Sequence, residues 1–171
     1  FINPRLAAGD GTEGMGQTAE NLVELHGISR EDQDAFAMRS QHKAAAAQRE
    51  GRLGEEIVPI AIPRRKQEDL IFESDEFIKP QTSLEVLGKL RPAFRKEGGS
   101  VTAGNASGLN DGAAALLMAN EAGLKASNLE PLAEIVSSAV VGVPPRIMGI
   151  GPVEASKRAL AKAGLGWDDV D

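Results

Sequence analysis

The sequence predicts an α/β protein in which a helical and ribbon region is followed by buried strands that alternate with helices. Helical apolar spacing recurs between residues 15 and 51 and again near the end of the chain. Two nearly pure apolar runs of strand length, residues 113–119 and 132–141, are separated by a helical stretch. Runs of this kind are typical of strands buried on both faces, as in a layered α/β protein.

Composition limits the function classes. The chain has 171 residues, of which 42% are hydrophobic and 26% charged, and these values suit a globular protein with its own core. A net charge of −6 argues against nucleic acid as a partner. No apolar run approaches the roughly 20 residues that span a bilayer, and no secretory signal is visible. We therefore expect no membrane segment and a cytoplasmic location.

The chain contains no cysteine. Disulfides, thiolate metal sites and a cysteine nucleophile are therefore absent from this sequence, and no metal site is predicted. The chain also opens on Phe1 rather than methionine and stops at Asp171 just past a helical segment. We expect it to be a piece of a longer protein.

The first elements form a helical hairpin over residues 15–51. Gly27 and Ile28 end the first helix with a left-handed residue and a contact from Ile28 to Val23. Ser29 is placed to cap the second helix, and acidic residues follow in its first turn.

A ribbon and a short helix follow the hairpin. Residues 57–62 and 70–72 are rich in β-branched and apolar side chains, so they predict two short paired strands. Residues 83–90 predict a short helix that Pro92 ends.

The last elements alternate between strand and helix. The two apolar runs flank a helix over residues 121–126, and a final helix covers residues 152–163. Pro152 is expected at its first position and Gly164 as its stop, with Leu165 contacting Leu160.

Residues 101–112 are a run of small side chains that neither helix nor strand propensity explains. Its glycines and alanines would let a ligand or another backbone approach closely. A tight loop explains it equally well, and it is not a phosphate-binding loop because it lacks the Gly-Lys-Ser/Thr ending and any cation. The motif Asn105-Ala106-Ser107 matches a glycosylation sequon, which we attribute to chance without a secretion signal.

Other candidate sites are weaker. Gly149 and Gly151 sit where a dinucleotide fingerprint would lie, but Glu154 occupies the third-glycine position and would repel a pyrophosphate. His26 and His42 have no partner at a triad or metal spacing and are expected on the surface. The basic run 64–66 is interpreted as a solvated face, whereas the run 89–96 could also guide a phosphorylated ligand.

Four blocks of residues resemble the thiolase family in order and spacing. They are Met15-Gly-Gln-Thr-Ala-Glu-Asn21, Ser29-Arg-Glu-Asp-Gln-Asp-Ala-Phe-Ala37, Gly104-Asn-Ala-Ser-Gly-Leu-Asn-Asp-Gly-Ala-Ala-Ala115 and Met148-Gly-Ile-Gly-Pro152. The opening Phe1-Ile-Asn-Pro4 is similar to the degradative branch, which includes 3-oxoadipyl-CoA thiolases.

The resemblance implies a layered αβαβα architecture of two similar halves with an inserted loop domain that covers coenzyme A. By position, residues 1–108 would be the loop domain, 109–131 the end of the N-terminal half and 132–171 the start of the C-terminal half. It also implies a homotetramer or homodimer. Acyl-CoA and coenzyme A would be substrates, with no covalently bound cofactor.

The resemblance also implies which residues line the acyl-CoA site. Lys79 stands where relatives have an arginine and would keep the phosphate contact only as a point charge. Val86 replaces a serine, and Gly14 replaces the histidine of biosynthetic relatives. The remaining lining residues are mostly apolar, as suits a thioester arm: Leu6, Met15, Ala103, Ala106, Ser107, Leu109 and Met148.

The family reaction is acyl transfer through a cysteine thioester, with a histidine that activates the thiol and a second cysteine as acid or base. No residue of this chain is assigned to that chemistry. Relatives carry the nucleophile upstream of the matching segment and their Asn-Glu-Ala-Phe, Gly-His-Pro and Cys-x-Gly motifs downstream of it. Two alternatives stay open: an acyl-CoA-binding or scaffold protein that lost the chemistry, and a nicotinamide-dependent dehydrogenase suggested by Gly149 and Gly151.

Overall fold

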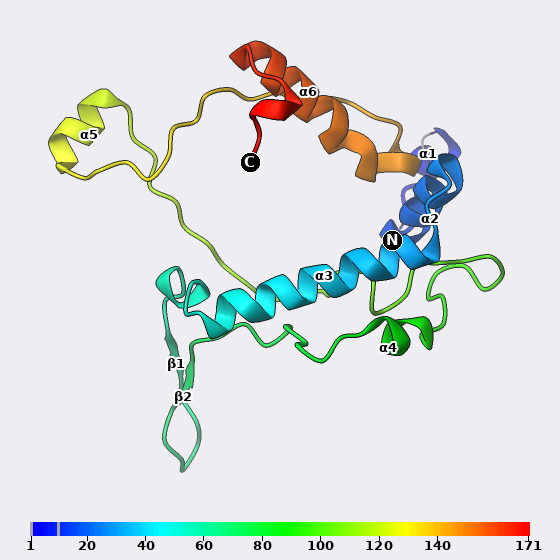
Figure 1. Cartoon of the computed structure of the whole chain (residues 1–171), viewed down its shortest axis with the longest axis horizontal. Helices are drawn as coiled ribbons and strands as arrows, with labels where there is room; N and C mark the ends of the chain where they lie inside the picture. Colours follow the sequence, from blue (N-terminus) through cyan, green and yellow to red (C-terminus); the bar gives the residue numbers. More distant parts are fainter. Residues whose placement is uncertain (1, 10) are drawn as a thin grey trace. The chain divides into compact units, whose positions relative to one another are not determined.

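The computed structural model describes residues 2–9 and 11–171, so Phe1 and Asp10 lie outside the described residues. The chain divides into two compact units. Unit 2 is Gly14–Gly108, and unit 1 combines Phe1–Glu13 with Leu109–Asp171. Each unit is built from different elements, shown along the chain in Figure 1.

The helical hairpin of unit 2 is confirmed as α2 (Met15–His26) and α3 (Arg30–Arg49). Gly27 ends α2 with a left-handed φ of 61°, and the amide of Ile28 donates to the Val23 carbonyl at 3.1 Å. Ser29 caps α3 by accepting a hydrogen bond from the Asp32 amide at 3.0 Å. Local signals in the sequence therefore set the end of α2 and the start of α3.

The ribbon and the short helix of unit 2 are also confirmed. Strands β1 (Ile60–Ile62) and β2 (Leu70–Phe72) pair antiparallel, with Ala61 opposite Ile71. Helix α4 (Leu84–Gly88) begins at Ser83, whose hydroxyl accepts from the Val86 amide at 3.3 Å. Helix α3 packs against α4 and against a short 3₁₀ turn, η1 (Leu53–Glu55), as Figure 1 shows for α4.

Unit 1 contains α1 (Pro4–Gly9), α5 (Glu121–Ser127) and α6 (Gly151–Ala163), with 3₁₀ turns η2 (Pro145–Ile150) and η3 (Trp167–Asp169). Helix α6 ends as predicted at Gly164, with φ 72°, and the Leu165 amide donates to the Leu160 carbonyl at 2.9 Å. Helix α1 was not predicted, because six residues give too short a window for apolar periodicity.

The two apolar runs are not strands in this chain, so that prediction is wrong. Residues 113–119 and 132–141 form neither helix nor strand, and none of the described residues pairs with them in a sheet. Leu117 and Val140 are 83% and 92% exposed. A strand buried on both faces needs neighbouring strands and covering helices, and its own sequence cannot supply them.

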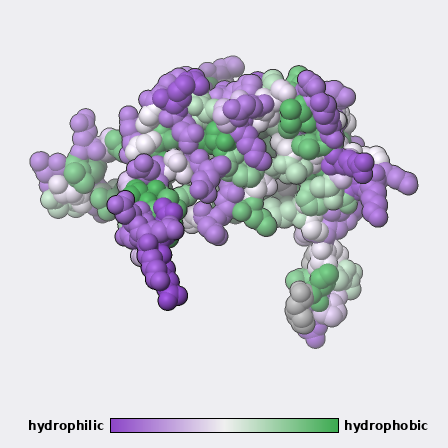
Figure 2. Space-filling model, turned by 90° about the horizontal axis from the view of Figure 1, so that it is seen from below, coloured by the Kyte–Doolittle hydropathy of each residue, from purple (hydrophilic) through white to green (hydrophobic). Residues whose placement is uncertain are grey.

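Apolar side chains therefore lie open on the surface, and Figure 2 shows several in green on the face in view. Among the described residues, only Leu87 and Val101 are hydrophobic side chains classed as buried, at 3% and 6% exposure. Buried polar side chains outnumber them: Thr18, Glu20, Asp34, Ser100 and Thr102. The interior of unit 2 is thus held by polar contacts.

We expect the 171-residue chain to self-associate when purified, because unpaired apolar runs offer both strand edges and apolar surface to other copies. Light scattering coupled to size exclusion would show species well above the 18.0 kDa of one chain. The variant carrying Leu117→Lys and Val140→Lys is the matched control and is expected to associate less. A monodisperse 18.0 kDa species for the unmodified chain would contradict this expectation.

No helix among the residues that the structure describes has the length and apolar character needed to cross a membrane.

Candidate functional site

Residues 100–108, which overlap the first part of the run 101–112, form a loop that is anchored at its start and exposed further on. Thr102 is fully buried, at 0% exposure, and Ser100 and Val101 on its N-terminal side are buried as well. Ala103 and Ser107 are exposed, whereas Ala106 is half-buried. We call residues 100–108 the small-residue loop. Its anchored part fixes the backbone, and its open part is free to meet a ligand.

Glu20 of α2 holds the start of this loop. Its carboxylate is 1% exposed and accepts hydrogen bonds from the backbone amides of Ser100, at 2.9 and 3.1 Å, and of Val101, at 2.8 Å. The Ser100 hydroxyl adds a third donor at 3.2 Å. Hydrogen bonds to an ionised acceptor are about twice as strong as neutral ones, so they offset the cost of burying the carboxylate.

Thr102 and Asn105 close the loop on itself. The Asn105 side-chain oxygen accepts from the Thr102 amide at 2.7 Å. The Thr102 hydroxyl accepts from the amides of Gly104, at 3.1 Å, and Asn105, at 3.3 Å. The Asn105 side-chain nitrogen donates to the Ser100 carbonyl at 3.0 Å. These reciprocal bonds define one conformation of the backbone.

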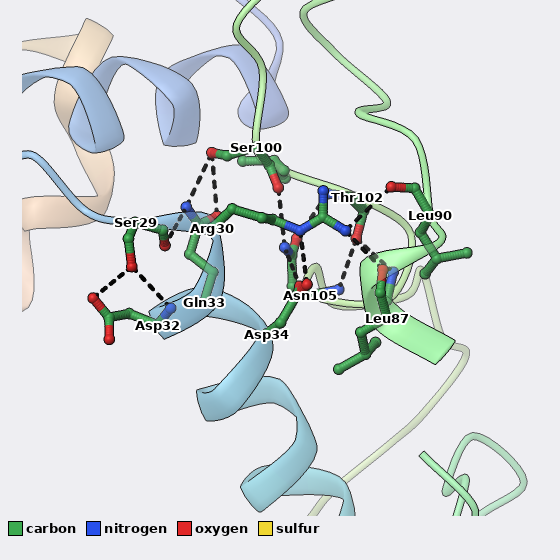
Figure 3. A network of polar contacts seen from close by, with 12 residues as sticks. Ser29, Arg30, Asp32, Gln33, Asp34, Leu87, Leu90, Ser100, Thr102 and Asn105 are labelled. Atoms are coloured by element: carbon green, nitrogen blue, oxygen red, sulfur yellow. Dashed lines mark hydrogen bonds and ion pairs between the residues drawn. The ribbon is translucent and has the colours of Figure 1, made fainter. Parts of the chain in front are cut away.

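Asn105 also joins the loop to α3, as Figure 3 shows. Its side-chain nitrogen donates to the buried carboxylate of Asp34 at 2.9 Å, and Arg30 donates to the same carboxylate at 2.8 Å. Arg30 further donates to the carbonyls of Leu87 and Leu90, at 2.7 and 3.1 Å. One arginine therefore satisfies a buried carboxylate and two carbonyls at the end of α4.

Gly104 lets the loop rest directly on two leucines. A Cβ atom at this position would lie 2.5 Å from a methyl carbon of Leu87 and 2.5 Å from one of Leu90. Real Cβ atoms essentially never approach so closely, so a side chain here would require the leucine methyl groups or the loop to shift. The glycine is explained by a close approach rather than by a left-handed backbone.

A depression of about 400 Å³ lies on the surface beside the anchored loop. Helix α3 supplies most of its lining residues, among them Arg39, whose guanidinium lies 5.7 Å from the Phe36 ring centre. The lining residues are Ile28, Asp32, Gln33, Phe36, Arg39 and Asn105. Among the described residues, no three histidine or acidic side chains gather to hold a metal ion.

Five of the predicted lining residues belong to unit 2. Ala103, Ala106 and Ser107 share the small-residue loop, and Met15 is the first residue of α2 with its side chain 73% exposed. The Lys79 ammonium lies 5.0 Å from the ring centre of Phe77, and its backbone amide donates to the Gln41 side chain at 2.8 Å. An aromatic ring thus restrains the lysine that we expect near a phosphate.

The other three predicted lining residues belong to unit 1. Leu6 lies on α1, Leu109 follows the small-residue loop, and Met148 lies in η2. All three side chains are largely exposed, at 52%, 107% and 48% respectively. Exposed apolar side chains are available to a ligand or to another part of a longer protein.

In the part of the chain that the structure describes, the two histidines and the glycine pair show none of the surroundings that catalysis or dinucleotide binding would require. His26 is exposed as predicted, and His42, also exposed, donates from Nε2 to the Thr82 carbonyl at 2.8 Å. Gly149 and Gly151 fall in η2 and at the start of α6. No strand among the described residues directly precedes them, although a dinucleotide fingerprint requires one there.

The residues that hold the loop were missed from the sequence. The sequence analysis assigns no anchoring role to Glu20, Asp34, Thr102 or Asn105. One signal was available: Glu20 stands between Ala19 and Val23, where helical spacing favours an apolar residue. A charge on the inner face of a helix predicts a buried partner.

Two family models match the chain in sequence order. The thiolase N-terminal domain matches residues 5–122, and the thiolase C-terminal domain matches residues 129–171.

Curated relatives cover the whole chain. An acetyl-CoA acetyltransferase of Chromobacterium violaceum is 51% identical over 171 residues, which are 100% of this chain and 43% of that protein. A 3-oxoadipyl-CoA/3-oxo-5,6-dehydrosuberyl-CoA thiolase of Escherichia coli is also 51% identical, over 100% of this chain and 42% of that protein. The chain thus spans about two fifths of the length of these relatives.

Solved structures agree with the sequence matches. The Bacillus anthracis acetyl-CoA acetyltransferase superposes with a TM-score of 0.87 and 48% identity, over 92% of this chain and 39% of that one. Human mitochondrial 3-ketoacyl-CoA thiolase gives a TM-score of 0.84 and 48% identity over the same shares. The helices and the small ribbon are those of part of an α/β thiolase fold, and the chain belongs to the thiolase family.

Proposed function

We propose that this chain is part of an acyl-CoA C-acyltransferase that cleaves or forms 3-ketoacyl-CoA through a cysteine thioester. Its contribution is a binding surface for coenzyme A. Support comes from the relatives that match all 171 residues and carry the names acetyl-CoA acetyltransferase and thiolase. In this proposal residues 1–108 form the loop domain, 109–131 end the N-terminal half and 132–171 begin the C-terminal half.

The observation that carries the proposed binding role is the construction of the small-residue loop. Ala103, Ala106 and Ser107 have side chains too small to obstruct a pantetheine arm, and the loop's backbone is fixed by buried carboxylates on α2 and α3. A preorganised surface binds a flexible arm more tightly because the protein loses little entropy on binding. The Ser107 hydroxyl offers a hydrogen bond to an amide of that arm.

The remaining proposed contacts are distributed along the chain. Lys79 supplies a positive charge for a phosphate, and Leu6, Met15, Leu109 and Met148 supply apolar surface for the acyl arm. No cysteine is present, so the thiol chemistry belongs to residues outside positions 1–171. The reading frame around this chain tests that assignment. It is expected to encode an upstream cysteine and downstream Gly-His-Pro and Cys-x-Gly motifs.

We expect the 171-residue chain alone to catalyse no thiolysis of a 3-ketoacyl-CoA, because it holds no thiol that could accept the acyl group. The assay follows loss of the 3-ketoacyl thioester on addition of coenzyme A, with the complete gene product as the positive control. Turnover by the chain after removal of any host thiolase would show that the reactive group lies within it. If the complete gene product shows no turnover, the acyltransferase activity is contradicted and the alternative of a non-catalytic acyl-CoA-binding protein is favoured.

A further inference from the structure

We propose that Glu20 is a positioning residue for coenzyme A, acting through the backbone of the small-residue loop. This inference rests on the proposed function, because it assumes that the loop meets coenzyme A. Glu20 itself lies on α2 at 1% exposure and offers no surface to a ligand. Its effect on binding would come entirely from the loop residues that it holds.

The environment of Glu20 fits a role in holding backbone. None of the ion pairs found among the described residues involves Glu20. Its hydrogen-bond donors are the backbone amide and hydroxyl of Ser100 and the backbone amide of Val101. A buried carboxylate without a cation needs donors that converge on it, because burial removes the water that would otherwise bind its oxygens. The donors here come from two adjacent residues, so the carboxylate fixes the direction of one short piece of chain.

That piece of chain leads directly into the proposed binding residues. Val101 is followed by the fully buried Thr102 and then by the exposed Ala103. Because Thr102 and Asn105 tie residues 102–105 into one turn, a shift of the Ser100 and Val101 amides would move the whole turn. Ala106 and Ser107 follow that turn. Glu20 therefore affects the position of Ala106 and Ser107 through the intervening backbone, since no described hydrogen bond joins it to either residue.

Glu20→Gln in the complete gene product is the test. The amide has nearly the same size, but one of its ends is a donor that would face the donors of Ser100 and Val101. We expect the KM for coenzyme A in thiolysis to rise about tenfold, with kcat changed by less than about threefold. Ser100→Ala, which removes only the hydroxyl, is expected to raise KM by about twofold to threefold.

Glu24→Gln is the matched control. Glu24 lies one turn further along α2, its side chain is 75% exposed, and it pairs with Arg95 at 3.3 Å. Among the described hydrogen bonds, none joins Glu24 to the small-residue loop. The KM of the Glu24→Gln enzyme for coenzyme A is therefore expected to stay at the wild-type value. If Glu20→Gln does not fold, the KM of Ser100→Ala is compared with that of Glu24→Gln. A rise in KM for Ser100→Ala alone supports the positioning role, and equal KM values contradict it.

The outcomes separate the alternatives. A merely structural Glu20 would lower the fraction of active enzyme, and so the apparent kcat, at an unchanged KM; that result would overturn the positioning role while leaving the proposed function intact. A raised KM for coenzyme A at a normal active-site titre supports the positioning role. If the wild-type gene product neither turns over 3-ketoacyl-CoA nor binds coenzyme A by calorimetry, the proposed function fails and the positioning role fails with it.

Discussion

Ala106→Trp in the complete gene product is expected to weaken coenzyme A binding by roughly a hundredfold, equivalent to about 3 kcal/mol. The Ala106 side chain is half-buried on the small-residue loop, whose start is held in place by Glu20. Because the loop backbone is fixed, it cannot retreat to make room for an indole. The ring would therefore occupy the space proposed for the pantetheine arm. Calorimetric titration of coenzyme A measures the effect.

Two controls accompany this variant. Ala44→Trp adds the same ring at a half-buried alanine of α3 outside the proposed site and is expected to leave affinity unchanged. Arg64→Ala removes a charge from the exposed turn between β1 and β2 and is expected to cost less than Ala106→Trp, since salt screens exposed charges. Wild-type affinity in a folded Ala106→Trp protein would remove the loop from the coenzyme A site.

Asp34→Ala is expected to destabilise the protein by about 3 kcal/mol, because it leaves the Arg30 guanidinium in a partly buried position without its carboxylate. The side-chain exposure is 23% for Arg30 and 6% for Asp34, so water would replace the lost partner only in part. Asn105 would lose its bond to α3 at the same time. For a unit of the size of residues 14–108 the unfolding midpoint would fall by roughly 12 to 24 °C.

Thermal unfolding followed by circular dichroism is the measurement for Asp34→Ala. Glu31→Ala is the control, because Glu31 is an exposed acid of the same helix, and it is expected to change the midpoint little. An unchanged midpoint in Asp34→Ala would mean that the network of Arg30, Asp34 and Asn105 does not stabilise the loop. The positioning role of Glu20 does not depend on that result, since Glu20 holds the loop separately.

The local elements could be predicted because their signals are local. Gly27, Ser29 and Gly164 each satisfy helix-end groups within a few residues of their own position. The ribbon follows from two short β-branched and apolar segments separated by a charged turn. None of these elements needs a distant partner to form its first hydrogen bonds.

The buried network could not be predicted because its bonds join distant parts of the chain. Glu20 and Ser100 are 80 positions apart, and Arg30 and Leu87 are 57 apart. The position of Glu20 on the inner face of α2 indicates a buried partner, but the sequence does not identify the segment that supplies that partner. The apolar runs failed for a related reason, since their sequence indicates burial but not what covers them.

The polar interior of unit 2 has a further consequence for its response to temperature. The heat capacity change of unfolding grows with the apolar area exposed and falls with the polar area exposed. Within residues 14–108 the most buried side chains are Thr102 and Glu20, so local opening of this unit exposes little apolar surface. The free energy of unfolding of this unit is therefore expected to vary little with temperature.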